Sequence, residues 1–109
     1  MTGPVPALQA MSIAIQGYAD AAYPPGGSDC AQTARAGLLD TAEKISQQVD
    51  LGYKQVTISR RIKSHIKAAI QYYLQVSAEQ GCDTELTEKR CRLLLALLNG
   101  QTVQDTEWP

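Results

Sequence analysis

The residues of this chain best suited to covalent or metal chemistry are three cysteines, Cys30, Cys82 and Cys91, and one histidine, His65. Thiolates and imidazoles hold zinc in tetrahedral sites whose ligands follow short characteristic spacings, and these residues show none of them. An odd number of cysteines without a CxxC pair is not typical of a secreted disulfide framework, so it predicts a reducing compartment. We therefore expect a cytoplasmic protein with no metal and no cofactor, in which the cysteines are small, buried or half-buried hydrophobes.

One thiol pairing stays open. If the second and third predicted helices form an antiparallel hairpin, Cys30 at the start of one and Cys82 just past the end of the other lie at the same end of the bundle. A disulfide or a regulatory thiol pair could form there. His65 lies between Ile62 and Ile66 with no residue nearby that would orient its ring, so we expect a boundary histidine and not a catalytic base.

The sequence lacks the motifs of common enzyme classes. GxSxG, GxxxxGK, HExxH and GxGxxG do not occur in it, and the pair Gly26-Gly27 follows two prolines with no strand before it. The carboxylates are scattered over predicted helix ends and outer faces, without an evident acid and base pair. We expect a protein that acts by binding and is not an enzyme.

The most apolar part of the sequence is the run Leu93-Leu94-Leu95-Ala96-Leu97-Leu98. At about 100° per residue its side chains, with Leu86 and Cys91, cover an arc of roughly 200°, whereas a helix buried on one face needs about 100°. In so short a chain we expect the additional surface to belong to another molecule, either a second copy or a regulated partner. The residues predicted to dock there are Leu93, Leu94, Leu97 and Leu98.

The charges are unevenly distributed along the chain. The formal net charge of −1 argues against a general nucleic-acid binder, because attraction to phosphates needs an excess of Lys and Arg. Between Leu51 and Ala78, however, basic residues occur and acidic ones do not. Such a stretch fits a solvated outer face or a surface that docks on an acidic partner. The residues predicted to supply charge complementarity are Arg60, Arg61, Lys63 and Lys67.

Four helical segments are expected to position these residues, because apolar residues recur at steps of three and four along the chain. Prolines and glycines separate the segments. Strand-like alternation appears only in the short stretch Gln55-Val56-Thr57-Ile58. The expected segments run from Pro4 to Ala22, from an N-cap at Asp29 to Gly52, from near Thr57 to Gln80, and from Asp83 or Thr84 to Asn99.

Length and composition fit one small domain. The chain has 109 residues, 44% of them hydrophobic, and its lack of Phe favours a helical core of Leu, Ile, Val, Ala and Met. No stretch is long and apolar enough to span a bilayer, and the opening segment lacks the basic start of a signal peptide. We therefore predict an all-α, small four-helix bundle over residues 1–100 that dimerises, followed by a polar tail at residues 101–109.

One alternative concerns the start of the third segment. Residues 52–63 resemble the turn and recognition helix of bacterial helix-turn-helix regulators, which often have Gly, an apolar residue, three variable residues and then Thr-Val-Ser-Arg. In such a motif Thr57, Ser59, Arg60, Arg61 and Lys63 would contact bases and phosphates. The preceding helix carries Gln48 where these regulators have a small residue such as Ala, so DNA binding stays an alternative.

The layout of the chain also resembles a known family. A Pro-Pro turn before the second helix, a Gly52-Tyr53-Lys54 junction, a long third helix and a leucine-rich last helix are similar to the bacterial quorum-sensing anti-activators of the QslA/TraM type. The resemblance implies a homodimeric cytoplasmic protein that binds a LuxR-type transcriptional activator and blocks its dimerisation or its DNA binding. A phage or plasmid structural subunit is a further alternative, which large ordered assemblies in solution would indicate.

Overall fold

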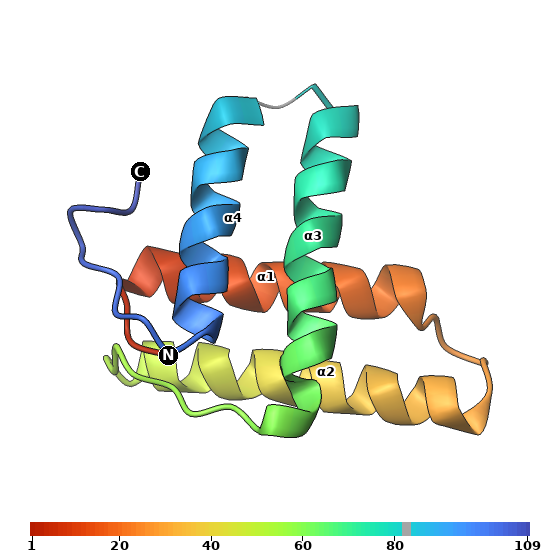
Figure 1. Ribbon diagram of the computed structural model, residues 1–109. Helices are drawn as coiled ribbons and strands as arrows, with labels where there is room; N and C mark the ends of the chain where they lie inside the picture. Colours follow the sequence, from red (N-terminus) through yellow and green to blue (C-terminus); the bar gives the residue numbers. More distant parts are fainter. Residues whose placement is uncertain (82–83) are drawn as a thin grey trace.

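The computed structural model describes residues 1–81 and 84–109, which form an all-α four-helix bundle (Figure 1). Its helices are α1 (Val5–Ala22), α2 (Asp29–Asp50), α3 (Lys63–Glu79) and α4 (Thr84–Leu98). Helices α1 and α2 pack as one antiparallel hairpin, α3 and α4 as another, and the second hairpin crosses a face of the first. The predicted all-helical fold is confirmed. Among the described residues, no helix has both the length and the apolar character needed to cross a bilayer.

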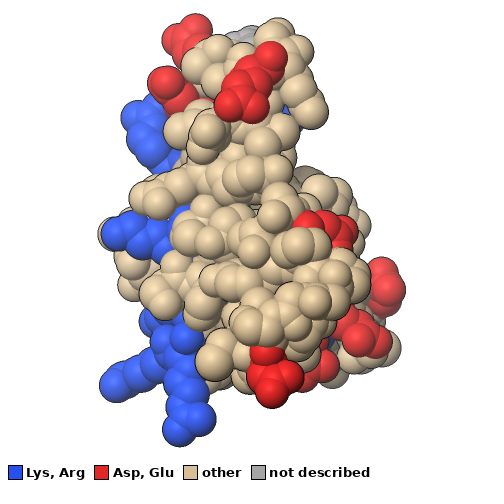
Figure 2. All heavy atoms as spheres, turned by 90° about the vertical axis from the view of Figure 1, so that its right-hand side faces the viewer, with Lys and Arg blue, Asp and Glu red and all other residues tan. Residues whose placement is uncertain are grey.

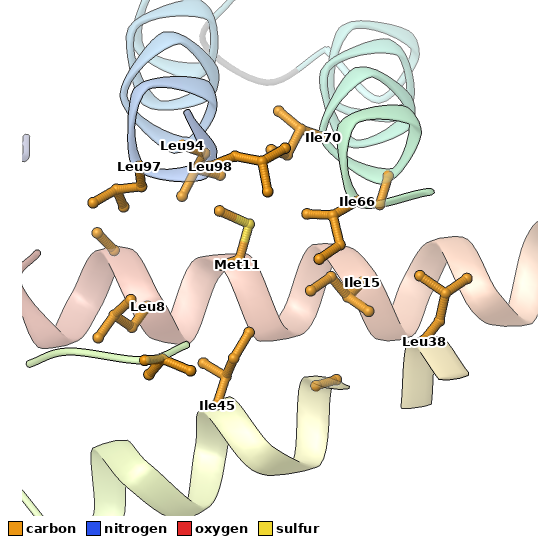
Figure 3. Packing of buried hydrophobic residues seen from close by; sticks show 14 of the residues in the cluster. Leu8, Met11, Ile15, Leu38, Ile45, Ile66, Ile70, Leu94, Leu97 and Leu98 are labelled. Carbon is orange, nitrogen blue, oxygen red and sulfur yellow. The ribbon is translucent and has the colours of Figure 1, made fainter. Parts of the chain in front are cut away.

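Helix α1 lies in the middle of the molecule, between α2 and the α3/α4 hairpin (Figure 3). Its side chains Leu8, Met11 and Ile15 are fully buried because they have neighbours on both sides. The hydroxyl of Ser12, also buried, lies 2.9 Å from Ser46 Oγ and donates to the Ala42 carbonyl at 3.0 Å. The other helices complete the core with Leu38, Ile45, Ile66, Ile70, Leu94 and Leu97.

Local interactions explain where α2 begins and ends. Its N-cap is Ser28 and not Asp29 as expected: the Ser28 hydroxyl accepts a hydrogen bond from the Ala31 backbone N–H at 3.2 Å. At the other end, Gly52 adopts a φ of 86°, a left-handed conformation that glycine reaches without a steric penalty. The chain leaves the helix there and turns toward its own N-terminus.

The start of α3 differs from the sequence expectation. A helix was predicted from near Thr57, whereas Arg60–Ile62 form a short 3₁₀ helix, η1, and α3 begins only at Lys63. The reason is tertiary: Val56 is buried in the core, its backbone N–H donates to the Met1 carbonyl at 2.8 Å, and Thr2 bridges to Gln55. These contacts hold residues 55–59 outside any helix.

The C-terminal segment also differs. Residues 101–109 were expected as a polar tail, but Val103 is only 4% exposed and belongs to the core. Its backbone N–H donates to the Thr2 carbonyl at 3.1 Å, and Asp105 forms an ion pair of 2.9 Å with Lys54. Trp108 packs partly against the core. The segment therefore packs against the N-terminal residues and covers part of the core.

Candidate protein-binding surface

Three of the four leucines proposed to dock a partner lie in the core of the chain itself. Leu94 and Leu97 are 0% exposed and Leu98 is 5% exposed. Figure 3 shows them pointing toward Met11 and the neighbouring side chains of α1. The expectation that they need a surface from another molecule is corrected, because a single chain already encloses them.

The wide apolar arc of α4 has a physical explanation within the fold. Helix α4 packs on α3 and on α1, and the N-terminal segment covers it further. Gly3 lies so close that an added Cβ would stand 2.8 Å from Leu97 Cδ2. A helix with this many neighbours buries much more than one face. The wide arc of α4 therefore reflects several contacts within the chain itself.

Leu93 differs from the other three predicted leucines. It is half-buried and lines a shallow surface hollow with Lys89 and Arg92. It is therefore the member of the predicted leucine set that remains partly accessible to another molecule.

The four predicted basic residues do lie together. Arg60 and Arg61 form η1, Lys63 is the first residue of α3, and Lys67 follows one turn later on the same side of the helix. All four side chains are exposed, and none of them takes part in an ion pair among the described residues, where Arg35–Asp20 and Lys54–Asp105 are the pairs. We refer to Arg60, Arg61, Lys63 and Lys67 as the basic surface.

On the face of the molecule drawn in Figure 2, the basic and most of the acidic side chains are separated. In Figure 2 the Lys and Arg side chains gather along one edge, whereas the Asp and Glu side chains lie at the top and on the other side. A protein with a net charge near zero can therefore still present a local positive potential. This potential would attract an acidic partner and raise the rate of encounter.

The position of these cations is unfavourable for the helix itself. The N-terminal end of a helix carries a partial positive charge and is stabilised by Asp or Glu in the first turn. The first turn of α3 contains no acidic residue, and Lys63 occupies its first position. The chain thus places cations where its own stability would favour anions, as is typical of a surface kept for binding.

The described cysteines, Cys30 and Cys91, differ in their surroundings. Cys91 is buried, its thiol donates to the Ile70 carbonyl at 3.8 Å, and burial raises the pKa of this thiol, which keeps it protonated. Cys30 is exposed, contrary to expectation. Cys82 lies outside the described residues, so its pairing with Cys30 stays a prediction. Among the described residues, no group of three or more His, Cys, Asp or Glu side chains could hold a metal ion.

His65 belongs to a small aromatic cluster. Its Nδ1 lies 3.3 Å from the Tyr23 hydroxyl, and the Tyr23 ring makes edge contacts with His65 and with Tyr18. Tyr18 in turn contacts Tyr72. These contacts join the end of α1 to α3. The expectation that no residue orients the His65 ring is wrong, because Tyr23, 42 residues earlier in the chain, contacts it; the half-buried histidine is part of the packing.

The sequence interpretation missed the large apolar side chains that are exposed. Ile13 is 65% exposed, and Leu51 and Tyr53 also point to solvent. A signal for Ile13 was present: the inner stripe of α1 runs through Leu8, Met11 and Ile15, and Ile13 falls outside it. An exposed isoleucine on the outer face of a helix is a candidate for contact with another molecule.

The fold and this surface together define a small all-α domain with an exposed basic surface. The helix-turn-helix alternative lacks its expected geometry, because Thr57 and Ser59 lie outside any helix and a nine-residue connection, 51–59, separates α2 from η1. Comparisons with models of protein families, with curated proteins and with solved structures found no match.

Proposed function

We propose that this protein acts by binding another protein, and that the basic surface docks on an acidic face of a transcriptional activator of the LuxR type. Occupancy of that face would block the dimerisation of the activator or its DNA binding. The observation that carries the proposal is the group of four exposed cations without ion-pair partners at the start of α3, among the described residues. The activator class comes from the resemblance in layout to quorum-sensing anti-activators.

The contact differs from the one expected from the leucine run. Affinity would come from charge-assisted hydrogen bonds of Arg60 and Arg61 to carboxylates, since a guanidinium can bind a carboxylate through two parallel bonds. Leu93 is the leucine of the predicted set that could add apolar contact. Sedimentation in solution tests whether the protein forms a homodimer, since the leucines expected to join two copies are buried within one chain.

Crosslinking in the native cell tests the proposal. The full chain is expressed with a photoreactive amino acid at Ser64, which is exposed beside Lys63, and the crosslinked proteins are identified by mass spectrometry. An activator with an acidic face should be recovered with the wild-type basic surface, and should be lost when Arg60 and Arg61 are both replaced by glutamine. Recovery that is equal in both proteins would contradict a role for these arginines.

The substitution Lys63→Glu should weaken binding of the partner and at the same time stabilise the fold. The substitution places an anion at the first position of α3, so we expect the free energy of unfolding to rise by about 0.5 kcal/mol. Affinity for the crosslinked partner should fall at least about ten-fold, because an attraction becomes a repulsion. Urea denaturation followed by circular dichroism measures the first effect, and a titration with the purified partner measures the second.

Two variants serve as controls for this prediction. Lys67→Glu changes the same charge one turn into the helix, so it should weaken binding without the gain in stability. Lys44→Glu changes an exposed lysine of α2 outside the basic surface and should leave affinity within about two-fold of the wild type. If Lys44→Glu weakened binding as much as Lys63→Glu, only net charge would matter and the proposed surface would be wrong.

DNA binding is the second candidate, favoured by the same edge of Lys and Arg side chains (Figure 2). A gel-shift assay with genomic fragments distinguishes the two functions. Phosphate contacts release counterions, so DNA binding by the isolated protein would weaken steeply with added salt. Tight, salt-sensitive shifts would favour a DNA-binding regulator over a protein-binding one.

A further inference from the structure

A second surface feature lies where the C-terminal segment meets α1 and the α3/α4 hairpin. A concave region of about 310 Å³ lies there, and its lining comes from α1, α3, α4 and the C-terminal segment: Pro6, Gln9, Ala10, Ile13, Tyr73, Arg90 and Trp108. We call it the Trp108 hollow. Its walls combine polar and apolar side chains and include the strongly exposed Ile13, so it offers a place for an apolar side chain of another molecule beside a polar one.

Arg90 gives this hollow its charge. A guanidinium has five N–H donors, and Arg90 uses one of them in a long hydrogen bond of 3.5 Å from Nη2 to the Pro109 backbone oxygen. Its Nε is buried without a hydrogen-bond partner. The guanidinium carbon lies 5.8 Å from the centre of the Trp108 ring, and this contact holds the cation over the indole. The terminal nitrogens of Arg90 therefore keep free N–H donors for another molecule, whereas its buried Nε does not face solvent.

Among the described residues, no Asp or Glu forms an ion pair with Arg90. Among the described residues that line the hollow, none is acidic. The adjoining concave region shares Pro6, Arg90 and Trp108 with it and contains Asp105, but Asp105 is paired with Lys54 at 2.9 Å. A carboxylate brought by another molecule is the group that would complement Arg90, because it accepts two hydrogen bonds from a guanidinium.

We propose that the Trp108 hollow binds a peptide segment of another protein that carries an apolar side chain next to an Asp or Glu. The apolar side chain packs against Ile13 and Tyr73, and the carboxylate accepts hydrogen bonds from Arg90. This goes beyond the proposed function, since the residues involved are separate from Arg60, Arg61, Lys63 and Lys67. In Figure 1 the C-terminal segment runs beside α4, away from the start of α3.

A displayed library of random dodecapeptides, selected on the immobilised full chain, tests the proposal. Enriched peptides should combine Asp or Glu with a neighbouring Leu, Ile, Val or Phe. Trp108 is the single tryptophan of the chain, so binding of a synthesised peptide should shift its fluorescence directly. The absence of any enriched peptide, or enrichment of peptides without an acidic residue, would overturn the proposal.

Substitutions then test whether the peptide binds in the Trp108 hollow. Arg90→Gln should weaken it at least about ten-fold, and Ile13→Gln by a similar factor. Ile13 is exposed, so its replacement leaves the fold intact even if Arg90→Gln does not. Lys89→Gln removes the neighbouring charge outside the hollow and should change affinity less than about two-fold. Binding that survives Ile13→Gln but is lost in Lys63→Glu would assign the peptide to the basic surface and refute the proposal.

Discussion

Replacing Leu94 by glutamine is expected to lower the free energy of unfolding by about 4 kcal/mol, because the side chain is fully buried. Removal of the leucine side chain leaves part of its space empty. The glutamine amide is also buried without a hydrogen-bond partner, because Met11 and the other side chains around this position are apolar. Since small domains are stable by only about 5–15 kcal/mol, a large part of the stability of this chain would be lost. Urea denaturation monitored by circular dichroism measures the change.

The matched control is Leu93→Gln, one residue earlier on the same helix. Leu93 is half-buried beside Lys89 and Arg92, so the amide stays in contact with water and the cost should be below about 1 kcal/mol. Equal stability of Leu94→Gln and the wild type, accompanied by loss of a dimer in sedimentation, would restore the intermolecular role that the leucine run suggested.

Truncation of the chain after Gly100 should cost about 3 kcal/mol. It removes Val103 from the core and the partial cover that Trp108 provides, and burial of a valine alone is worth roughly 1.5 kcal/mol or more. It also breaks the hydrogen bond from Val103 to Thr2 and the ion pair between Asp105 and Lys54. A lower urea midpoint of the truncated chain would show the loss of stability. Circular dichroism without urea would show that the truncated chain is still helical.

A point variant identifies the source of this effect. Val103→Ser keeps the length of the chain and should reproduce about half of the loss, whereas Thr106→Ala, at an exposed position, should be neutral within about 0.5 kcal/mol. If the truncated chain were as stable as the full one, residues 101–109 would behave as the free polar tail that their composition predicts.

The sequence by itself determined the helices, because their signals are local. Apolar residues at steps of three and four, with Pro4 at the first helix and Gly52 and Gly100 at helix ends, specify where most of the chain is helical. The basic surface was predictable for the same reason: Arg60, Arg61 and Lys63 are neighbours along the chain, and Lys67 follows after one turn.

Only the tertiary structure decided what these helices contact. A wide apolar arc on α4 indicates that the helix has several neighbours, but it does not tell whether these neighbours belong to the same molecule. In this structure the neighbours are α1, α3 and the N-terminal segment of the same chain. Likewise Val56 and Val103 are held by Met1 and Thr2, far away in sequence, and these hydrogen bonds outweigh the local preference for a helix from Thr57 or a free tail. Long-range burial leaves no periodic signal in a short segment, so a single sequence could not reveal it.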